Sequence, residues 1–283
     1  MVQPTVNPTA EAGDISDGEA PAEPTSTLVL TTPAATFLDT RLTLPTATTP
    51  PAAAPLPNAG GPLARLDWAF SGSSESLPPA DVPAASLAAP LVAVDAGALA
   101  SPAHGGTGWL RVPRKRWNHV VDSRCAWGAS PRPDEGCMFP VAGRPEACLE
   151  VGAMEKVPGS GAVVAYQELW VTVDARQVGN ERRRQGMVLS LSIPDEKARG
   201  IVVRVGQFCQ GLLMIDHEIT LERWEYCAGP RSPGGGWQRV AKLGGRFLPC
   251  QWTFEGGRAE GVEVGNTLVD EKFEWKVEEK FAW

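Results

Sequence analysis

The sequence predicts an all-β protein, built as two antiparallel β-barrels in tandem after a disordered N-terminal tail. Two observations carry this prediction. Segments of about five to ten residues, rich in β-branched and aromatic side chains, recur along the chain and are separated by turns drawn from its 30 glycines and 26 prolines. In addition, apolar and polar residues alternate within many of these segments, and no stretch after residue 63 shows the 3.6-residue period of a helix.

Residues 1–62 form the predicted tail. They are dominated by Ala, Pro, Thr, Ser and acidic residues, whereas all ten tryptophans lie from Trp68 onward. Such a composition buries too little apolar surface to offset its ordering entropy, so we expect removal of residues 1–60 to leave folding intact. Ser16 is a phosphorylation candidate because Asp17 and Glu19 follow it closely. The alternative is an unmodified, solvated tail.

The first barrel domain is expected over residues 64–183. Residues 66–70 are typical of a first strand, and the Ala- and Pro-rich segment 78–102 indicates an inserted loop with at most one helical turn. Residues 117–122 and 163–173 alternate as further strands, while the sequence D-E-G at 134–136 indicates a turn.

The second barrel domain is expected over residues 184–283. Residues 187–193 alternate cleanly, and residues 201–226 predict three strands joined by turns so short that they form an up-and-down meander. This meander favours lipocalin-like (calycin-type) barrels. The last strand places Trp275 between Phe273 and Val277 on its apolar face, so we expect Trp275 to be buried in the barrel interior.

Charge and cysteine usage narrow the class of protein. The formal net charge of −7 and the pI near 5.1 argue against binding to nucleic acid, which requires a basic surface. No signal peptide and no apolar run of about 20 residues is present, so we expect a soluble intracellular protein that does not bind a membrane. The six cysteines lack a C-x-x-C motif and are expected to be reduced thiols.

Enzymatic chemistry finds little support. His119, Asp122 and Ser123 suggest a hydrolase, but on a regular strand His119 and Asp122 point to opposite faces, and no G-x-S-x-G motif occurs. We expect Asp122 to pair with Arg124 instead. The three histidines show no spacing for a metal or haem, so neither a catalytic residue nor a cofactor is predicted.

Two kinds of binding residue are candidates. Glu168 shares a strand face with two aromatic residues. It is either a ligand anchor in a barrel lumen, paired with Arg204, or an outward-facing charge, and the alternation does not decide between the two. The candidate ligand-binding residues are Tyr166, Glu168, Trp170, Arg204 and Trp275. The candidate partner-binding residues are two basic clusters, Arg114-Lys115-Arg116 and Arg182-Arg183-Arg184. A solvated hairpin edge is the alternative for both clusters.

Several motifs, in the same order along the chain, resemble the fungal HRI family. The resemblance covers roughly residues 64–283. The motifs are W-N-H-V-V-D-S-R at 117–124, D-E-G at 134–136, Y-Q-E-L-W at 166–170, R-V-G-Q-F-C-Q-G at 204–211, E-R-W at 222–224 and W-K-V-E-E at 275–279. The proline-rich tail and the 78–102 insertion depart from the family pattern, so nothing carries over there.

The resemblance implies tandem lipocalin-like barrels, a cytoplasmic and nuclear location, no established enzymatic activity, and a casein-kinase-I-type kinase as partner. Two functions are therefore weighed. The first is a non-catalytic interaction or scaffold protein, and the alternative is a carrier that holds a small apolar ligand in a barrel lumen. Ten tryptophans favour filled interiors, and hence the scaffold.

Overall fold

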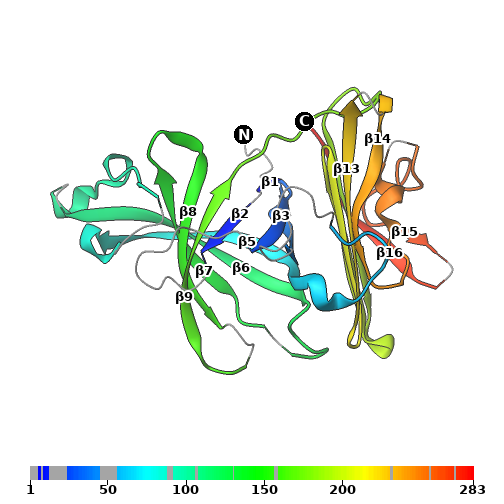
Figure 1. Ribbon diagram of the computed structural model, residues 1–283, viewed down its shortest axis with the longest axis horizontal. Coiled ribbons are helices and arrows are strands. Elements are labelled where there is room, and N and C mark those ends of the chain that lie inside the picture. The colour runs from blue at the N-terminus through cyan, green and yellow to red at the C-terminus, as the bar shows by residue number, and fades with distance from the viewer. Residues whose placement is uncertain are drawn as a thin grey trace.

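The computed structural model shows an all-β protein with two antiparallel sheets in tandem, which confirms the predicted fold class. Figure 1 shows the two sheets side by side. The structure describes residues 6–7, 9–12, 24–44, 56–87, 92–105, 108–129, 131–155, 159–229, 232–254, 256–270 and 272–283. Within these residues the only helical segments are short 3₁₀ turns.

The first sheet has nine strands among the described residues and is closed by the N-terminal segment. Its order is β1-β3-β4-β5-β6-β7-β8-β9-β2. Because β1 and β2 are almost consecutive in the chain, their pairing with β3 and β9 joins the two ends of the sheet into a barrel. The strands are β1 (Val6–Asn7), β2 (Thr9–Ala12), β3 (Thr25–Thr31), β4 (Thr36–Thr43), β5 (Leu66–Pro83), β6 (Trp109–Asp122), β7 (Asp134–Val141), β8 (Arg144–Glu155) and β9 (Val163–Val171).

The second sheet contains the predicted meander. Its seven described strands run in the order β14-β13-β12-β11-β10-β16-β15. They are β10 (Gln185–Ile193), β11 (Ala198–Val205), β12 (Phe208–Ile215), β13 (Glu218–Gly229), β14 (Ser232–Leu243), β15 (Thr267–Val269) and β16 (Glu274–Ala282). The 3₁₀ helix η6 (Pro249–Thr253) packs against this sheet, and four of its five residues are buried.

The expectation of a disordered tail was wrong for residues 25–43, which form the β3–β4 hairpin of the first sheet. Leu30, Leu38 and Leu42 are fully buried there. The hairpin is short and Thr-rich, so its composition resembles a tail, but its apolar residues pack on both sheets. Ser16, the phosphorylation candidate in the predicted tail, lies outside the described residues.

Two smaller expectations also change. Residues 134–136 begin strand β7 rather than forming a turn. The expected loop at 78–102 is shorter, because β5 continues to Pro83 and pairs with β6. Three 3₁₀ turns, at 84–86, 97–99 and 102–104, then follow among the described residues.

A buried polar network joins the two sheets. Gln210 on β12 donates to the backbone carbonyls of Leu28 and Leu38 at 3.0 and 3.2 Å. Arg223 on β13 donates to the carbonyl oxygen of Thr40 at 2.9 Å, and burial lowers the pKa of this arginine to about 10. Because isolated polar groups are costly to bury, these bonds tie the β3–β4 hairpin to the second sheet.

The far side of the second sheet holds a separate apolar core. Trp275 is completely buried there among Leu213, Val202 and Trp252, which confirms its predicted burial. The first sheet keeps a further apolar cluster around Leu149 and Phe139 at the end of the barrel near the 92–105 segment. The interior between β4, β5, β6, β8 and β9 is instead lined by charged and aromatic side chains, and it holds the candidate site.

Candidate functional site

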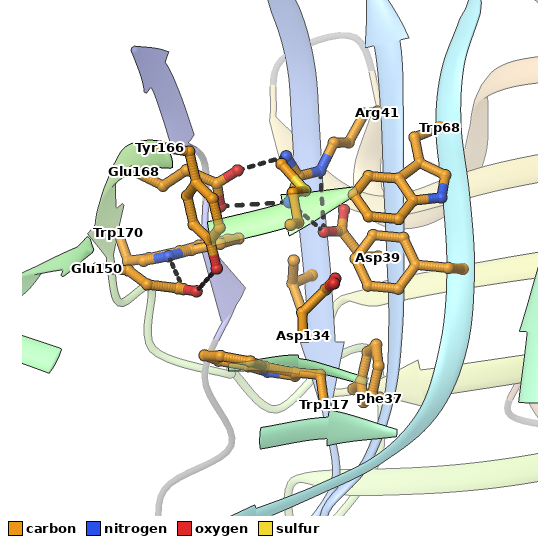
Figure 2. Close-up of a pocket in the computed structure, with 13 residues that line it drawn as sticks. Phe37, Asp39, Arg41, Trp68, Trp117, Asp134, Glu150, Tyr166, Glu168 and Trp170 are labelled. Carbon is orange, nitrogen blue, oxygen red and sulfur yellow. Dashed lines mark hydrogen bonds and ion pairs between the residues drawn. The ribbon is translucent and has the colours of Figure 1, made fainter. Parts of the chain in front are cut away.

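The interior of the first barrel contains an arginine held between two carboxylates. Arg41 on β4 donates from Nη1 to Oε1 of Glu168 on β9 at 2.6 Å, and from Nε and Nη2 to Oδ2 of Asp39 at 3.0 and 2.9 Å. Its guanidinium carbon lies 5.3 Å from the ring centroid of Trp68 and 5.9 Å from that of Trp170. Figure 2 shows this group with its aromatic neighbours. All three charged side chains are almost fully buried, so the charges stabilise one another.

A further carboxylate in this interior, that of Glu150 on β8, accepts hydrogen bonds from two side chains of β9. Tyr166 Oη donates to Oε1 at 2.5 Å and Trp170 Nε1 donates to Oε2 at 2.7 Å. Burial, followed by the negative charge of Glu168, raises the pKa of Glu150 to about 8. Gly152 provides the room, because a Cβ at this position would lie 2.4 Å from the hydroxyl oxygen of Tyr166.

His119 on β6 lies between two carboxylates, contrary to the expectation that His119 and Asp122 point apart. Its Nδ1 lies 2.9 Å from Oδ2 of Asp122, and its Nε2 lies 3.1 Å from Oδ2 of Asp134. The reason is a β-bulge, since Gly72 pairs with His119 whereas Ser71 pairs with Val121. Val120 is the extra residue, 67% exposed, and it changes the alternation of the strand.

The bulge depends on glycine. A Cβ at Gly72 would lie 1.8 Å from the carbonyl oxygen of Asn118, so no larger residue fits without moving the backbone. Sequence alternation alone therefore misjudges the facing of His119.

The charge state of His119 follows from its two partners. Burial opposes its protonation most strongly, but the carboxylates of Asp122 and Asp134 outweigh burial and raise its pKa to about 9. Asp122 also accepts from Trp68 Nε1 at 2.9 Å, and its pKa is lowered by His119 and its other donors despite burial. A protonated histidine held between carboxylates stabilises charge and is not available as a general base at neutral pH.

Ser123 and Arg124 have other partners than those expected. The Oγ of Ser123 accepts the backbone N–H of Ala69 at 2.9 Å. Arg124 donates to Oδ2 of Asp67 at 3.1 Å and stacks on Trp68, whereas only its backbone N–H reaches Asp122. The expected Asp122–Arg124 ion pair was therefore wrong, and the described contacts assemble no hydrolytic triad.

The space in this barrel has two parts. The inner part, between the rings of Trp117 and Trp170, has a volume of only about 40 Å³. The outer part is a hollow of about 850 Å³ at the mouth of the barrel, between residues 124–129 and 131–135 on one side and residues 153–155 and 159–163 on the other. Trp68, Asp134 and Met154 line both parts, so the two spaces adjoin. The interior is thus largely filled, and the larger open space lies at the mouth.

The five candidate lumen residues divide between the two sheets. Tyr166, Glu168 and Trp170 line the inner space of the first barrel. Arg204 and Trp275 belong to the second sheet, where Arg204 pairs with Glu181. The expected pairing of Glu168 with Arg204 was wrong, because Arg41 takes that place.

Sequence reasoning missed Asp39, Arg41 and Glu150. The first two lie in the segment that was assigned to the tail. Its alternation of Phe37, Asp39 and Arg41 with Leu38 and Leu42 was the signal that could have found them.

The two basic clusters differ in their surroundings. Arg114 and Arg116 point toward Glu135 on β7, each with a nitrogen 2.6 Å from one of its carboxylate oxygens. Arg182 and Arg183 are exposed in the segment between the sheets and make no ion pair among the described residues. Arg184, next to them, stacks on Trp283 with its guanidinium carbon 5.4 Å from the ring centroid.

Neither a metal-binding cluster nor a membrane-spanning helix occurs within the described part of the chain. No set of three or more His, Cys, Asp or Glu side chains there is arranged to hold a metal ion. Separately, none of the described helices has the length and apolar character to span a membrane.

The fold and site define an all-β protein of two tandem sheets, in which the first sheet encloses a charged, aromatic interior. The sequence matches the family described as Protein HRI1 over residues 15–279, so the chain belongs to the HRI1 family, as its motifs predicted. No match was found among curated proteins.

A solved structure shares the fold. The crystal structure of the uncharacterized protein YLR301w from Saccharomyces cerevisiae aligns with a TM-score of 0.61 and 15% sequence identity, over 99% of this chain and 100% of that chain. At this identity the likeness concerns the fold alone.

Proposed function

We propose that this protein is a non-catalytic interaction protein, a scaffold that binds an acidic protein segment at the linker between its two sheets. A casein-kinase-I-type kinase is the partner that the family resemblance favours, and cytoplasm and nucleus are the corresponding locations. The observation that carries the proposal is the exposed pair Arg182 and Arg183, which have no ion-pair partner among the described residues of an otherwise acidic protein.

The linker has buried residues that anchor it to the fold, whereas its residues Arg182 and Arg183 are exposed to solvent. Ala175 and Val178 are buried, and Glu181 forms a buried ion pair with Arg204. The backbone N–H of Glu181 donates to the carbonyl oxygen of Val178 at 3.1 Å, which closes a turn just before Arg182. Arginines on an anchored turn lose less conformational freedom on binding than arginines on a free tether, so they favour binding of carboxylates or phosphates.

The filled interior also supports a scaffold over a carrier of apolar ligands. An inner space of about 40 Å³ is far below the several hundred cubic ångströms of a typical small-molecule site, and its lining is charged. The Arg114-Lys115-Arg116 cluster supports docking less, because Arg114 and Arg116 already contact Glu135.

Charge reversal at the linker tests the proposal. The double variant Arg182→Glu/Arg183→Glu should weaken binding to a purified casein-kinase-I-type kinase by about tenfold or more, chiefly through slower association and with a strong dependence on salt. Biolayer interferometry at several salt concentrations measures this. Affinity purification of both forms, followed by mass spectrometry, then shows which acidic partners are lost.

The matched control reverses two exposed charges elsewhere. Arg144→Glu/Lys197→Glu changes the net charge equally, at sites that already have Glu146 and Asp216 as surface partners. We expect this control to lose only the part of kinase binding that depends on net charge alone, and otherwise to bind the kinase like the wild type. Equal binding by the linker variant and the wild type would overturn the proposal.

A further inference from the structure

The two adjoining spaces of the first barrel form a narrow inner end and a wide outer end. Asp134 stands at their junction, with its side chain 16% exposed. In Figure 2 this carboxylate lies above the rings of Trp117 and Phe37 and to the right of the Glu150–Tyr166 pair. A ligand entering from the mouth therefore meets Asp134 before it reaches the inner space.

The inner end carries more negative than positive charge. Glu150, with a pKa of about 8, is largely neutral at pH 7. Even so, the described ion pairs here join four other carboxylates to two cations. The carboxylates are Asp39, Asp122, Asp134 and Glu168, and the cations are Arg41 and protonated His119. A surplus of buried carboxylates is unfavourable, so an added positive charge would be stabilised there.

Aromatic rings complete the inner end. Trp117 and Phe37 lie below Asp134 in Figure 2, and Tyr166 and Trp170 line the opposite wall. Aromatic faces attract cations, most strongly where water is excluded. The barrel already shows this contact, because Arg41 lies within 6 Å of the rings of Trp68, Phe70 and Trp170.

The outer end offers room and apolar contact. Its volume is about 850 Å³, and apolar side chains of Ala126, Ala129, Pro133, Met154 and Val163 share its lining with polar and charged ones. The charged groups on its rim are largely neutralised, since Arg132 pairs with Glu155 and Arg124 pairs with Asp67. This lining suits an uncharged stem, whereas the inner 40 Å³ suits a group somewhat larger than one water molecule.

We propose that the first barrel binds an organic cation, an ammonium group on an apolar stem, with the ammonium at Asp134 beside the inner space and the stem in the mouth hollow. This site is separate from the linker arginines and selects the opposite charge. The two proposals therefore fail independently.

The direct test compares three probes of one shape. Hexylammonium, hexan-1-ol and hexanoate are titrated into the full chain at pH 7 by calorimetry, with tryptophan fluorescence reporting on Trp68, Trp117 and Trp170. Hexylammonium should bind saturably and about tenfold or more tighter than hexan-1-ol, and hexanoate should bind weakest. Equal binding of the three probes, or no saturable binding of hexylammonium up to about 10 mM, overturns the proposal.

Two variants locate the site. Asp134→Asn removes the charge at the junction with little change of shape. It should weaken the binding of hexylammonium by about tenfold and leave the binding of hexan-1-ol unchanged. Met154→Trp narrows the passage and should weaken both probes. Asp195→Asn, an exposed aspartate near the start of β11, is the control and should bind like the wild type. Thermal melting identifies the variants that fold, and hexylammonium binding unchanged in both folded site variants overturns the proposal.

One further arm distinguishes a free amine from a protein side chain. The ammonium of a lysine in a short blocked tripeptide carries the same head on a similar stem. Tighter binding of hexylammonium than of this peptide assigns the site to small amines, which is the result we expect because the inner space is narrow. Tighter binding of the peptide overturns the small-molecule form of the proposal.

Discussion

Each of the two sheets buries an arginine that pairs with a glutamate, but the surroundings of the two arginines differ. Arg41 in the first barrel and Arg204 in the second sheet are both buried, each pairs with a glutamate, and each lies over a tryptophan. The remaining donors of Arg204 reach backbone carbonyls, including that of Thr253 at 2.5 Å. Arg204 is therefore enclosed by its own fold.

Arg41 is surrounded differently. Its guanidinium pairs with a second carboxylate, that of Asp39. Glu150 and Asp134 also line the same space, and Arg41 is the one arginine among its described lining residues. The mouth hollow adjoins this group, whereas Arg204 sits beside the packed core around Trp275. A buried arginine whose other donors bond to backbone carbonyls stabilises its own fold. An arginine that neutralises only part of the surrounding negative charge, next to an open space, leaves a site where a cation is stabilised.

The largest effect is expected from removing the hairpin on which the first interior depends. A chain that begins at Gly61 lacks the fully buried Leu30, Leu38 and Leu42 as well as Arg41, and it removes the hairpin carbonyls to which Gln210 and Arg223 of the second sheet donate. We expect it to lose its cooperative melting transition or to melt more than about ten degrees lower. Circular dichroism on heating measures this, and melting within two degrees of the full chain would show that the hairpin is dispensable.

Next in size is the filled interior of the second sheet. Trp275→Ala should lower the free energy of unfolding by about 3–5 kcal/mol, because it leaves a large cavity among fully buried neighbours. Phe247→Ala is the control, since Phe247 is 50% exposed, and it should cost less than about 1 kcal/mol. Urea denaturation compares the two. Similar small losses for both variants would contradict the packing described for Trp275.

The two arginines provide the sharpest comparison. Arg41→Met and Arg204→Met should each lower the free energy of unfolding by about 3–5 kcal/mol, since each removes the arginine that forms an ion pair with a buried glutamate. The double variant Arg204→Met/Glu181→Leu should regain most of that loss. Arg41→Met/Glu168→Leu should regain less, because the buried ion pair between Asp39 and Arg41 is still lost. Equal recovery in both double variants, measured by urea denaturation, would remove the distinction drawn between the two interiors.

The smallest expected effect is a pH dependence that belongs to the first barrel. The folded-state pKa of His119 is raised from 6.5 to about 9, so its stabilising contribution is fully present below pH 6.5 and is lost as the pH rises through 9. Glu150, with its pKa raised from 4.5 to about 8, adds a loss of stability as the pH rises from 4.5 to 8.

The variant His119→Gln separates these two contributions. It should reduce the loss of stability between pH 6.5 and 9 by at most about 3 kcal/mol, keep the part of that loss below pH 8 that belongs to Glu150, and leave the slope below pH 6.5 unchanged. Urea midpoints over this range measure the effect. An unchanged slope above pH 6.5 in the variant would show that His119 does not titrate as its carboxylate neighbours indicate.

The sequence by itself determined the class of the fold and several facings. The alternation in residues 187–193 and 273–277 correctly placed Met187, Leu189, Leu191, Trp275 and Val277 in a core, because side chains on a regular strand alternate between its two faces. The same rule placed Tyr166, Glu168 and Trp170 together in the first barrel. The family was also readable from short motifs in order.

Only the tertiary structure decided which charges meet. Arg41 and Glu168 are 127 positions apart in the chain, and their pairing depends on barrel closure rather than on any local pattern. His119 turned toward Asp122 because a single extra residue, Val120, shifts the alternation where Gly72 allows two strands to approach closely. Composition likewise assigned residues 25–43 to a tail, since the apolar surface that orders them is supplied by the other sheet. Local pattern fixes the facing of a regular strand, whereas bulges and long-range partners are determined by packing.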